Sequence, residues 1–497
     1  MPPLTTIRPT VPEPELTADG LADPLGDLAA PTHLKIEQYL PGDVLGGAHP
    51  APRLSWEIAS APAGWAPTGA DLEITRTDAA GTPLGEPEVL PLEAADGVLA
   101  PWPAPPLTSR DRVVLRVRVT GRSSETPDAA AGTDSDAAGT TAEADSPATA
   151  SPADTGWSEP IAYEVGLLDP ADWRALPVGP SWPENPLADR RPPRVRTEFD
   201  LPRPVVAARA YISAHGLIRA ELDGRRIGAD ELVPGWTVYG ERLIARTYDV
   251  TDLLTASGDG TGAHALGAQL ADGWYRGHIG FDGGYRNLYG EDIAAVVQLE
   301  VTHDDGSRSL IATDADWRAG VGEILFTDLY DGEKVDARRA APGWSRPGFD
   351  DSSWLPVEVG ASDAERLVMP TDAPVRAVET LRPVEVSVQE RRVLSLGGGE
   401  AELSPERVLI DFGQNISGRL RIRVSGPAGR TITLRHAEVL DDGVLGMRTL
   451  REAQATDTYT LAGDGVEEWE PAFAIHGFRY ADVTGGAAAA KAAIEDG

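Results

Sequence analysis

The feature that most constrains the fold is a two-residue alternation of apolar and polar side chains that recurs along the sequence. It is clear at Leu115, Val117 and Val119, which alternate with Arg116 and Arg118. Because successive side chains of a β-strand point to opposite faces, this period indicates strands with one face on a core and one in water. Amphipathic helical periodicity is hard to find anywhere in the sequence. We therefore predict an all-β protein.

The same alternation recurs in each part of the chain. Apolar positions two residues apart occur at Leu72 and Ile74, at Ala210, Ile212 and Ala214, at Ile218, Ala220 and Leu222, and at Leu420, Ile422 and Val424. Between them, Arg219 and Glu221, and likewise Arg419, Arg421 and Arg423, are expected to point to water. Asp223 and Gly224 supply a tight-turn signal at the end of one such run.

Length and composition shifts divide the chain into about three domains. Of the 497 residues, 1–30 are rich in Pro, Thr, Asp and Glu and are predicted to be a disordered leader. We expect β-modules at 32–168, 195–360 and 375–485, followed by a tail at 486–497. Residues 123–155 are nearly all small or polar and cannot bury enough apolar surface to offset their ordering entropy. They are expected to be a mobile loop inserted in the first module.

The charge balance excludes several classes of partner. A formal net charge of −34 and a pI near 4.5 argue against nucleic acid, which needs basic patches, and against an anionic membrane surface. The absence of cysteine excludes disulfides, thiol catalysis and Cys-ligated zinc. The first residues lack the apolar core of a signal peptide, and no run reaches the length of a membrane span. A cytoplasmic location is expected.

Short motifs of Gly, Trp, Tyr and Asp stand out against this background. In the second module they are Pro-Gly-Trp-Thr-Val-Tyr at 234–239, Tyr-Asp-Val-Thr-Asp at 248–252, Asp-Gly-Trp-Tyr-Arg-Gly at 272–277 and Tyr-Asp-Gly-Glu-Lys-Val-Asp-Ala-Arg at 330–338. Elsewhere they are Pro-Arg-Leu-Ser-Trp at 52–56, Asp-Phe-Gly-Gln-Asn at 411–415, Leu-Arg-His-Ala-Glu-Val-Leu at 434–440 and His-Gly-Phe-Arg-Tyr at 476–480. Several such motifs in one order are far more specific than any one alone.

These motifs, in this order, resemble the amino-terminal β-domains of bacterial α-L-rhamnosidases of glycoside hydrolase family 78. The resemblance implies tandem β-sandwich modules: an immunoglobulin-like domain, a jelly roll of the carbohydrate-binding kind and a concanavalin-like β-domain. It also implies cleavage of terminal α-L-rhamnosyl residues with inversion, for which two carboxyl groups lie about 6.5 to 9.5 Å apart.

In the family that the sequence resembles, both catalytic carboxyl groups lie in an (α/α)6 barrel that follows the third β-module. The barrel's Gly-Trp-Thr-Gly-Asp motif has no match after Tyr480, and only seventeen residues remain there. We therefore expect the catalytic barrel to be absent and assign no catalytic residue. The chain is expected to be a truncated product, a fragment or one piece of a split enzyme, and its missing catalytic domain is a possible partner.

Carbohydrate binding is the activity for which the β-modules themselves offer suitable residues. Proteins hold sugars with an aromatic platform and planar groups that make bidentate hydrogen bonds. Asp272, Trp274, Tyr275 and Arg276 combine these types, and on a strand Trp274 and Arg276 would share one face. A second loop at 280–290, with Phe281, Tyr285, Arg286 and Tyr289, could complete a rim. The alternative for Trp274 is a core or interface aromatic.

Three further candidates are Glu333, Asp336 and Arg338, for which an internal ion-pair network is the alternative to sugar binding. The resemblance adds that some family members bind L-rhamnose with a calcium ion, but no ligand position for calcium is assigned. The eight histidines are dispersed without a metal-binding spacing. Two functions stay open: the β-domain portion of an α-L-rhamnosidase, or a stand-alone carbohydrate-binding or scaffold protein that recognises L-rhamnose.

Overall fold

The computed structural model describes residues 27–93, 96–123, 152–389, 392–396, 399–404 and 407–485. The predicted leader, the inserted loop and the tail lie wholly or largely outside these residues. Within them the α-helices are single turns, α1 (Thr251–Leu254) and α2 (Gly273–Arg276). The same residues also contain the short 3-10 turns η2 (Pro170–Asp172), η3 (Ala337–Arg339) and η4 (Met447–Leu450). The predicted all-β class is confirmed, and the described residues form no helical barrel.

None of the helices in the described ranges is long and apolar enough to cross a membrane.

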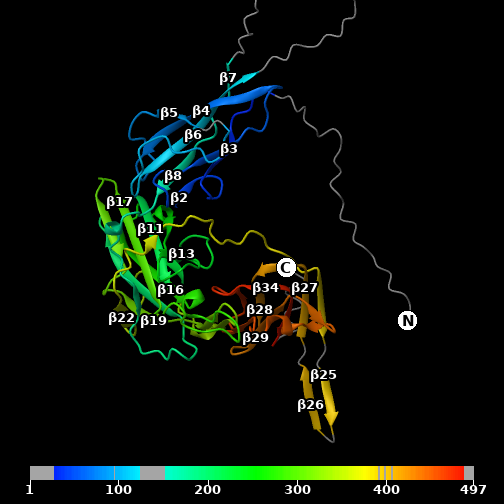
Figure 1. Ribbon diagram of the computed structural model, residues 1–497. Coiled ribbons are helices and arrows are strands. Elements are labelled where there is room, and N and C mark those ends of the chain that lie inside the picture. Colours follow the sequence, from blue (N-terminus) through cyan, green and yellow to red (C-terminus); the bar gives the residue numbers. More distant parts are fainter. Residues whose placement is uncertain are drawn as a thin grey trace, which may run out of the picture.

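The first module is a two-layer β-sandwich at one end of the molecule (Figure 1). Its apolar alternation is confirmed, because Leu115, Val117 and Val119 are fully buried in its core while Arg116 and Arg118 pair with carboxylates on the outer face. Strands β1 (Thr32–Ile36) and β3 (Leu54–Glu57) pair with each other. The larger sheet has the order β2 (Val44–Gly47), β8 (Ile161–Val165), β6 (Arg112–Ser123), β4 (Trp65–Thr77) and β5 (Glu88–Leu92), with β7 (Pro152–Asp154) beside β6.

The second module is a jelly-roll sandwich built from one continuous run of paired strands. Val297 on β17 and Leu270 on β16, from opposite halves of the strand order, belong to the same core, so the two halves pack face to face. Asp223 and Gly224 form the predicted two-residue turn between β12 and β13, and both have positive φ, 52° and 77°.

The strand order of the second module is β13 (Arg225–Arg226), β12 (Leu217–Leu222), β16 (Gly262–Ala271), β10 (Pro193–Leu201), β19 (Arg318–Val321), β22 (Leu355–Val359), β9 (Val178–Pro180), β17 (Ala294–His303), β11 (Val205–His215) and β15 (Arg246–Asp249). Strand β18 (Arg308–Ala312) pairs with β17, and the short β14 (Leu243–Ile244) pairs with β23 (Leu367–Val368). The sheet thus takes in β9, which precedes the module start expected at 195.

The third module shares its sheet with a hairpin from the second. Its order is β20 (Ile324–Asp328), β21 (Gly332–Asp336), β32 (Thr456–Thr460), β29 (Thr431–Ala437), β34 (His476–Thr484), β27 (Arg407–Gly418) and β24 (Glu385–Gln389). Strand β21 runs parallel to β32, with Lys334 opposite Thr458. The hairpin therefore leaves the second sandwich and completes the third, which ties the two modules together.

In the described residues, three short strand pairs accompany the third module. They are β25 (Arg392–Leu396) with β26 (Gly399–Ser404), β28 (Ile422–Ser425) with β33 (Val466–Trp469), and β30 (Leu440–Asp441) with β31 (Val444–Leu445). Figure 1 shows the third module, in orange and red, beside the green second module. Ion pairs join the first and second modules, with Arg110 on Glu300 at 2.6 Å and Arg209 on Glu164 at 2.7 Å.

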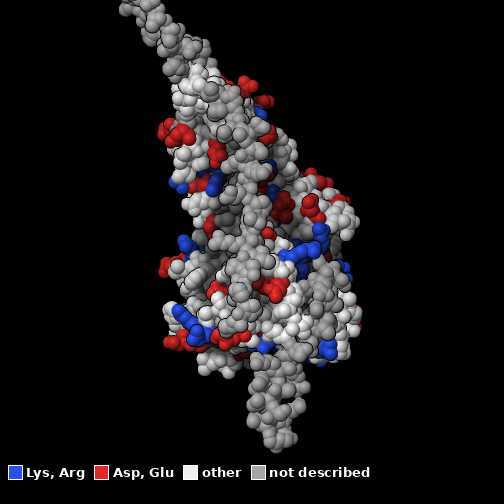
Figure 2. All heavy atoms as spheres, turned by 90° about the vertical axis from the view of Figure 1, so that its right-hand side faces the viewer, with Lys and Arg blue, Asp and Glu red and all other residues white. Residues whose placement is uncertain are grey.

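The surface charge is mixed locally in spite of the large negative total. On the face shown in Figure 2, acidic side chains are spread along the molecule with basic side chains among them, and no continuous basic patch is visible.

Candidate carbohydrate-binding site

The motif at 272–277 forms a helical turn instead of the strand considered from the sequence. Strand β16 ends at Ala271, and α2 follows at once. The turn begins at Gly273, whose φ is +53° and where a Cβ atom would lie only 2.5 Å from Leu217 Cγ, so glycine is required there. The strand placement of Trp274 and Arg276 is wrong, since consecutive side chains of a helical turn fan out in different directions.

Asp272 and Arg276 lie inside the protein as an ion pair. Arg276 Nε lies 2.5 Å from Asp272 Oδ1, and its Nη1 lies 2.6 Å from Glu184 Oε2. Arg276 is fully buried and Asp272 is 3% exposed. Both charges are paired within the fold, although Arg276 Nη2 has no hydrogen-bond partner among the described residues, and the pairing fixes the helical turn against the segment that carries Glu184.

Trp274 is half-buried between two modules. It packs against the core that Leu217 and Leu232 share with the third module, and its ring is parallel to that of Trp236, with centroids 6.1 Å apart. Trp236 itself is 55% exposed.

We expect Trp274→Ala to lower the free energy of unfolding by about 2 kcal/mol, because the half-buried ring loses contacts in the shared core. Trp236→Ala, which removes a mostly exposed ring, should change it by less than about 0.5 kcal/mol. Urea unfolding of the two variants measures the difference. Equal, small losses would show that Trp274 is a surface platform and not a packing residue.

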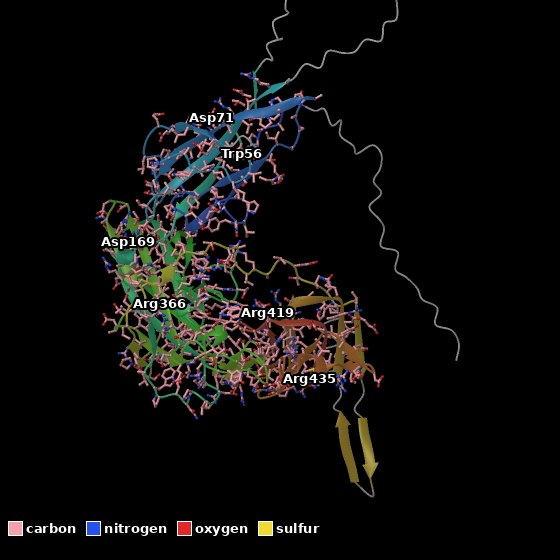
Figure 3. All side chains as sticks on the ribbon, in the orientation of Figure 1. Trp56, Asp71, Asp169, Arg366, Arg419 and Arg435 are labelled. Atoms are coloured by element: carbon pink, nitrogen blue, oxygen red, sulfur yellow. The ribbon has the colours of Figure 1, made fainter. Side chains whose placement is uncertain are left out.

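Tyr275 lines a pocket of about 490 Å³ in the second module. Its ring stacks on His215 with centroids 5.1 Å apart, and burial raises the pKa of its hydroxyl. The pocket is also lined by Trp182, which is half-buried, and by Arg366 (labelled in Figure 3), which pairs with the buried Asp363. An aromatic ring with planar hydrogen-bonding groups is the combination that holds a sugar, and the volume falls in the range of small-ligand sites.

Three carboxylates on the pocket rim are available for a ligand. Glu291, Asp292 and Glu358 are exposed and make no hydrogen bond or ion pair with any side chain that the structure describes. Arg190, only 5% exposed, also lines the pocket, and its Nε has no hydrogen-bond partner within the described residues. The pocket therefore offers both donors and acceptors to a polyhydroxylated ligand.

The sequence did not point to Trp182, Arg190, Glu291 or Asp292. Trp182 and Arg190 lie in the proline-rich segment before the expected start of the module, where no periodic pattern marks them. A lone tryptophan between prolines was the only available signal.

The calcium ion that the family resemblance suggests finds no prepared set of ligands at this pocket. In the described residues, the groups that bring three acidic or imidazole ligand atoms within 4.8 Å are His436, Asp457 and His476, and His278, Asp328 and Asp331. Calcium prefers six to eight oxygen ligands, so neither set suits it. No step is assigned to calcium.

Neither cluster has the geometry of a transition-metal site. The His436 and His476 rings stack at 4.3 Å and 24°, so their in-plane lone pairs cannot meet at one ion. His278 Nε2 accepts a hydrogen bond from Arg286 Nε at 2.8 Å, which places the imidazole hydrogen on Nδ1, facing Asp328. His436 Nε2 and His278 Nδ1 are buried without a hydrogen-bond partner among the described residues, and their nearest aspartate oxygens are on Asp457 at 3.9 Å and on Asp328 at 3.2 Å.

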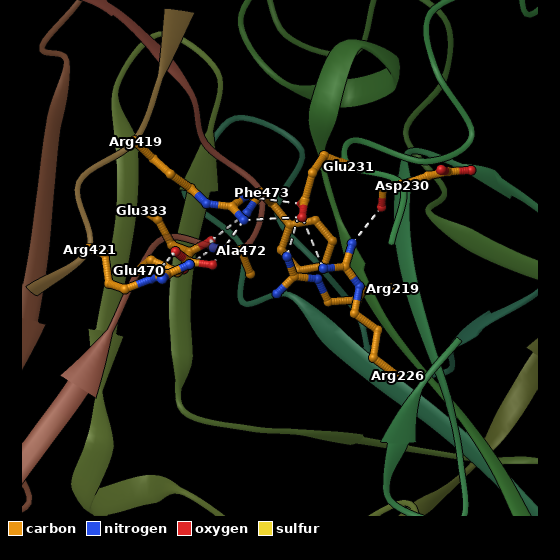
Figure 4. A network of polar contacts seen from close by, with 10 residues as sticks. All are labelled: Arg219, Arg226, Asp230, Glu231, Glu333, Arg419, Arg421, Glu470, Ala472 and Phe473. Carbon is orange, nitrogen blue, oxygen red and sulfur yellow. Dashed lines mark hydrogen bonds and ion pairs between the residues drawn. The ribbon is translucent and has the colours of Figure 1, made fainter. Parts of the chain in front are cut away.

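Glu333, Asp336 and Arg338 lie on and after β21, in the sheet of the third module. Glu333 is buried and accepts hydrogen bonds from the backbone N–H groups of Ala472 and Phe473 (Figure 4). Asp336 pairs with Arg338 at 2.8 Å. The structure therefore separates these three residues from the pocket that Tyr275 lines.

Comparison with known domain families gives matches to three consecutive segments. Residues 31–134 match the Rha78A-like, N-terminal immunoglobulin domain, 203–379 the alpha-L-rhamnosidase N-terminal domain, and 401–496 the bacterial alpha-L-rhamnosidase concanavalin-like domain. An α-L-rhamnosidase of Streptomyces avermitilis is 44% identical over 342 residues, and one of Alteromonas sp. is 36% identical over 341. These matches cover 67% and 66% of the chain.

Solved structures of α-L-rhamnosidases also superpose on this chain. The α-L-rhamnosidase of Aspergillus terreus superposes with a TM-score of 0.76 at 36% identity, covering 93% of the chain and 47% of the solved one. The Streptomyces avermitilis α-L-rhamnosidase complexed with L-rhamnose gives 0.70 at 28% identity, covering 92% and 56%. The chain spans about a third of the length of the curated relatives, 30% and 34% of the two named above.

Proposed function

We propose that this chain is the β-domain portion of an enzyme that removes terminal α-L-rhamnosyl residues with inversion. The chain belongs to the α-L-rhamnosidase family through its amino-terminal β-domains. The observation that carries the proposal is the match of three consecutive segments to the domains of that family, in the order immunoglobulin-like, N-terminal and concanavalin-like. A cytoplasmic location, expected from the sequence, remains part of the proposal.

The catalytic carboxyl groups of this enzyme are proposed to lie outside the described β-domains. Inverting hydrolysis needs an acid and a base on opposite sides of the scissile bond, with room for a water molecule. In the described residues, the carboxyl group whose pKa is raised to about 7 is Glu333, which is buried and accepts hydrogen bonds from backbone amides. It has no access to a glycosidic bond.

The pocket beside Tyr275 is the part of this chain that we propose to contact L-rhamnose. Trp182 offers a ring to the C–H face of the sugar, and the rim carboxylates and Arg190 offer acceptors and donors to its hydroxyls. The same pocket supports the second candidate, a protein that binds rhamnosides without hydrolysing them, because binding requires no further domain.

We expect the purified chain to bind L-rhamnose with a Kd in the millimolar range, which corresponds to about 4 kcal/mol for a single small sugar, and not to hydrolyse an aryl α-L-rhamnoside. Titration calorimetry with and without calcium measures the first property, and release of the aryl alcohol measures the second. The double variant Glu291→Gln, Asp292→Asn should weaken binding at least tenfold while the protein stays folded, since neither side chain has a partner to lose.

The matched control is Asp252→Asn, which changes an exposed carboxylate on α1 away from the pocket. Binding that survives the double variant, or is lost equally in the control, contradicts the pocket assignment. Turnover that scales with protein concentration and disappears when one carboxylate of this chain is changed would place a catalytic site within the β-domains.

A further inference from the structure

The three carboxylates on the rim of the candidate pocket carry charge that no neighbour balances. Glu291 and Asp292 lie shortly before β17 and Glu358 lies on β22, and within the described residues none of these side chains makes an ion pair. Glu184, which also lines the pocket, differs because it pairs with Arg276 at 2.6 Å. The rim therefore holds unpaired negative charge from two separate segments of the chain.

The basic side chains that line the pocket already have partners among the described residues. Arg366 pairs with the buried Asp363, and the other oxygen of this carboxylate lies 2.7 Å from His215 Nε2. Arg190 is only 5% exposed and donates to Asn287 Oδ1 at 2.5 Å. Neither arginine is a free cation at the rim, so an incoming ligand meets a negative entrance.

The pocket is also larger than one monosaccharide needs. Its volume of about 490 Å³ is typical of sites for drug-sized ligands, and L-rhamnose has far fewer atoms than such a ligand. A rhamnosyl ring held inside the pocket leaves room for part of the group to which it is attached. That group points toward the opening, where the three rim carboxylates lie, and its charge therefore affects binding.

We propose that the pocket selects rhamnosides by charge, and that its preferred ligand is an L-rhamnoside whose attached group carries an ammonium group. The inference rests on the proposed function, because it concerns the pocket assigned there to L-rhamnose. A neutral rhamnoside binds more weakly, and one that carries a carboxylate, such as a rhamnoside of a uronic acid, binds most weakly. The net charge of −34 acts in the same direction at longer range.

The test compares three rhamnosides of similar size that differ in charge: aminoethyl, hydroxyethyl and carboxymethyl α-L-rhamnoside. Each is titrated into the full chain in a calorimeter at pH 7. Since one exposed ion pair contributes up to about fivefold, we expect the three carboxylates together to give the amine roughly tenfold tighter binding than the neutral compound. The carboxymethyl compound should bind roughly tenfold more weakly than the neutral one. Both differences should shrink at high salt, which screens exposed charges.

A single substitution tests whether the rim is the source of this preference. Glu358→Gln removes one rim charge and should reduce the preference for the amine about threefold. Asp252→Asn is the matched control, because it changes the net charge of the chain by the same amount at an exposed position on α1 away from the pocket. The control should leave the preference unchanged.

The contrary outcomes separate this inference from the proposed function. Equal affinity for the three rhamnosides, or tightest binding of the carboxymethyl compound, overturns the charge selection and leaves rhamnose binding in place. No binding of any of them overturns both proposals. A preference that Glu358→Gln leaves unchanged, or that the control reduces equally, shows that the rim is not its source and overturns the inference. Ethanolamine that binds as tightly as the aminoethyl rhamnoside also overturns it, because the amine would then bind without the sugar.

Discussion

Glu231→Ala is expected to lower the free energy of unfolding by about 3 kcal/mol, since removing one partner of a buried ion pair leaves its counter-charges uncompensated. Arg219 and Arg226 of the second module and Arg419 of the third all donate to this carboxylate, at 2.9 to 3.1 Å (Figure 4). The Glu231 side chain is only 10% exposed and that of Arg419 only 12%. The variant would leave Arg219 and Arg226 without their carboxylate partner at the junction of two modules, while Arg419 keeps Glu470 at 3.0 Å.

The same cluster gives the stability a predictable pH dependence. Burial alone would raise the pKa of Glu231, but hydrogen bonds from Arg419 and Arg226 and the charge of Arg219 outweigh it and lower the pKa to about 2. A carboxyl group with a lowered folded pKa stabilises the protein above its unfolded pKa, and loses that effect as the pH falls toward its folded pKa. The contribution of Glu231 should therefore be complete at pH 6 and disappear between about pH 4.5 and 2.

Urea unfolding at pH 7 and at pH 3 measures both the loss of stability and its pH dependence. Glu231→Gln, which keeps the shape of the side chain but removes its charge, is measured beside the alanine variant. Arg421→Ala is the control, because Arg421 pairs with Glu470 in the same network but is 65% exposed, and such a pair is worth less than about 1 kcal/mol. If Glu231→Ala costs no more than this control, the cluster does not hold the two modules together.

The alternation of apolar and polar residues was sufficient to predict the strands that pair and pack within a single module. Leu72 and Leu115 are fully buried as the alternation predicts, and the Asp223-Gly224 turn closes the hairpin that its residue types require. These features depend on neighbours close in the chain or on a single core, so the pattern of one strand contains the information.

Contacts between modules could not be predicted in this way. Arg219 and Arg419 were expected to face water, and both predictions are wrong because each side chain turns toward Glu231. A polar residue on the outer face of a strand has the same sequence pattern whether that face meets water or another module. The crossover of the β20–β21 hairpin into the third sheet has the same explanation, since strand pairing across modules leaves no local signal.

The candidate site shows the same difference between local features, which the sequence indicates, and contacts between distant segments, which it does not. The motif that contains Tyr275 was singled out from the sequence as a candidate for sugar binding, and the structure places Tyr275 in the wall of a pocket. The remaining lining residues come from a proline-rich segment, from strands such as β11, β17 and β22, and from the loop at 360–366, which only the folded sheet brings together. Trp274, for which an interface role was one alternative, packs at the junction of the second and third modules.

Glu333 occupies an unusual position for a carboxyl group, and its environment decides its charge. It lies on β21 where the hairpin enters the third module, 1% exposed, and accepts hydrogen bonds at 2.9 and 3.0 Å from Phe473 and Ala472. Burial raises its pKa to about 7, and the nearby Asp457 adds to the shift, while the two backbone N–H groups and Arg219 oppose it. In the unfolded chain the pKa returns to about 4.3.

Glu333→Gln is therefore expected to stabilise the protein in alkaline solution. A carboxyl group with a raised folded pKa favours folding below its unfolded pKa, and that advantage is lost as the pH rises toward and past 7. Glutamine retains an oxygen for the two N–H donors but never ionises. The variant should gain roughly 3 to 4 kcal/mol over the wild type at pH 8, because each pKa unit corresponds to about 1.4 kcal/mol, and almost nothing at pH 4.

The measurement is the difference in unfolding free energy between variant and wild type, by urea titration at pH 4, 6 and 8. Taking the difference cancels every other titrating group that the two proteins share. Glu385→Gln, on the exposed edge strand β24, is the control and should show no change with pH. A gain that is absent at pH 8, or equal at pH 4 and pH 8, would mean that the pKa of Glu333 is not raised on folding, because the amides of Ala472 and Phe473 stabilise its charged form as well as water does.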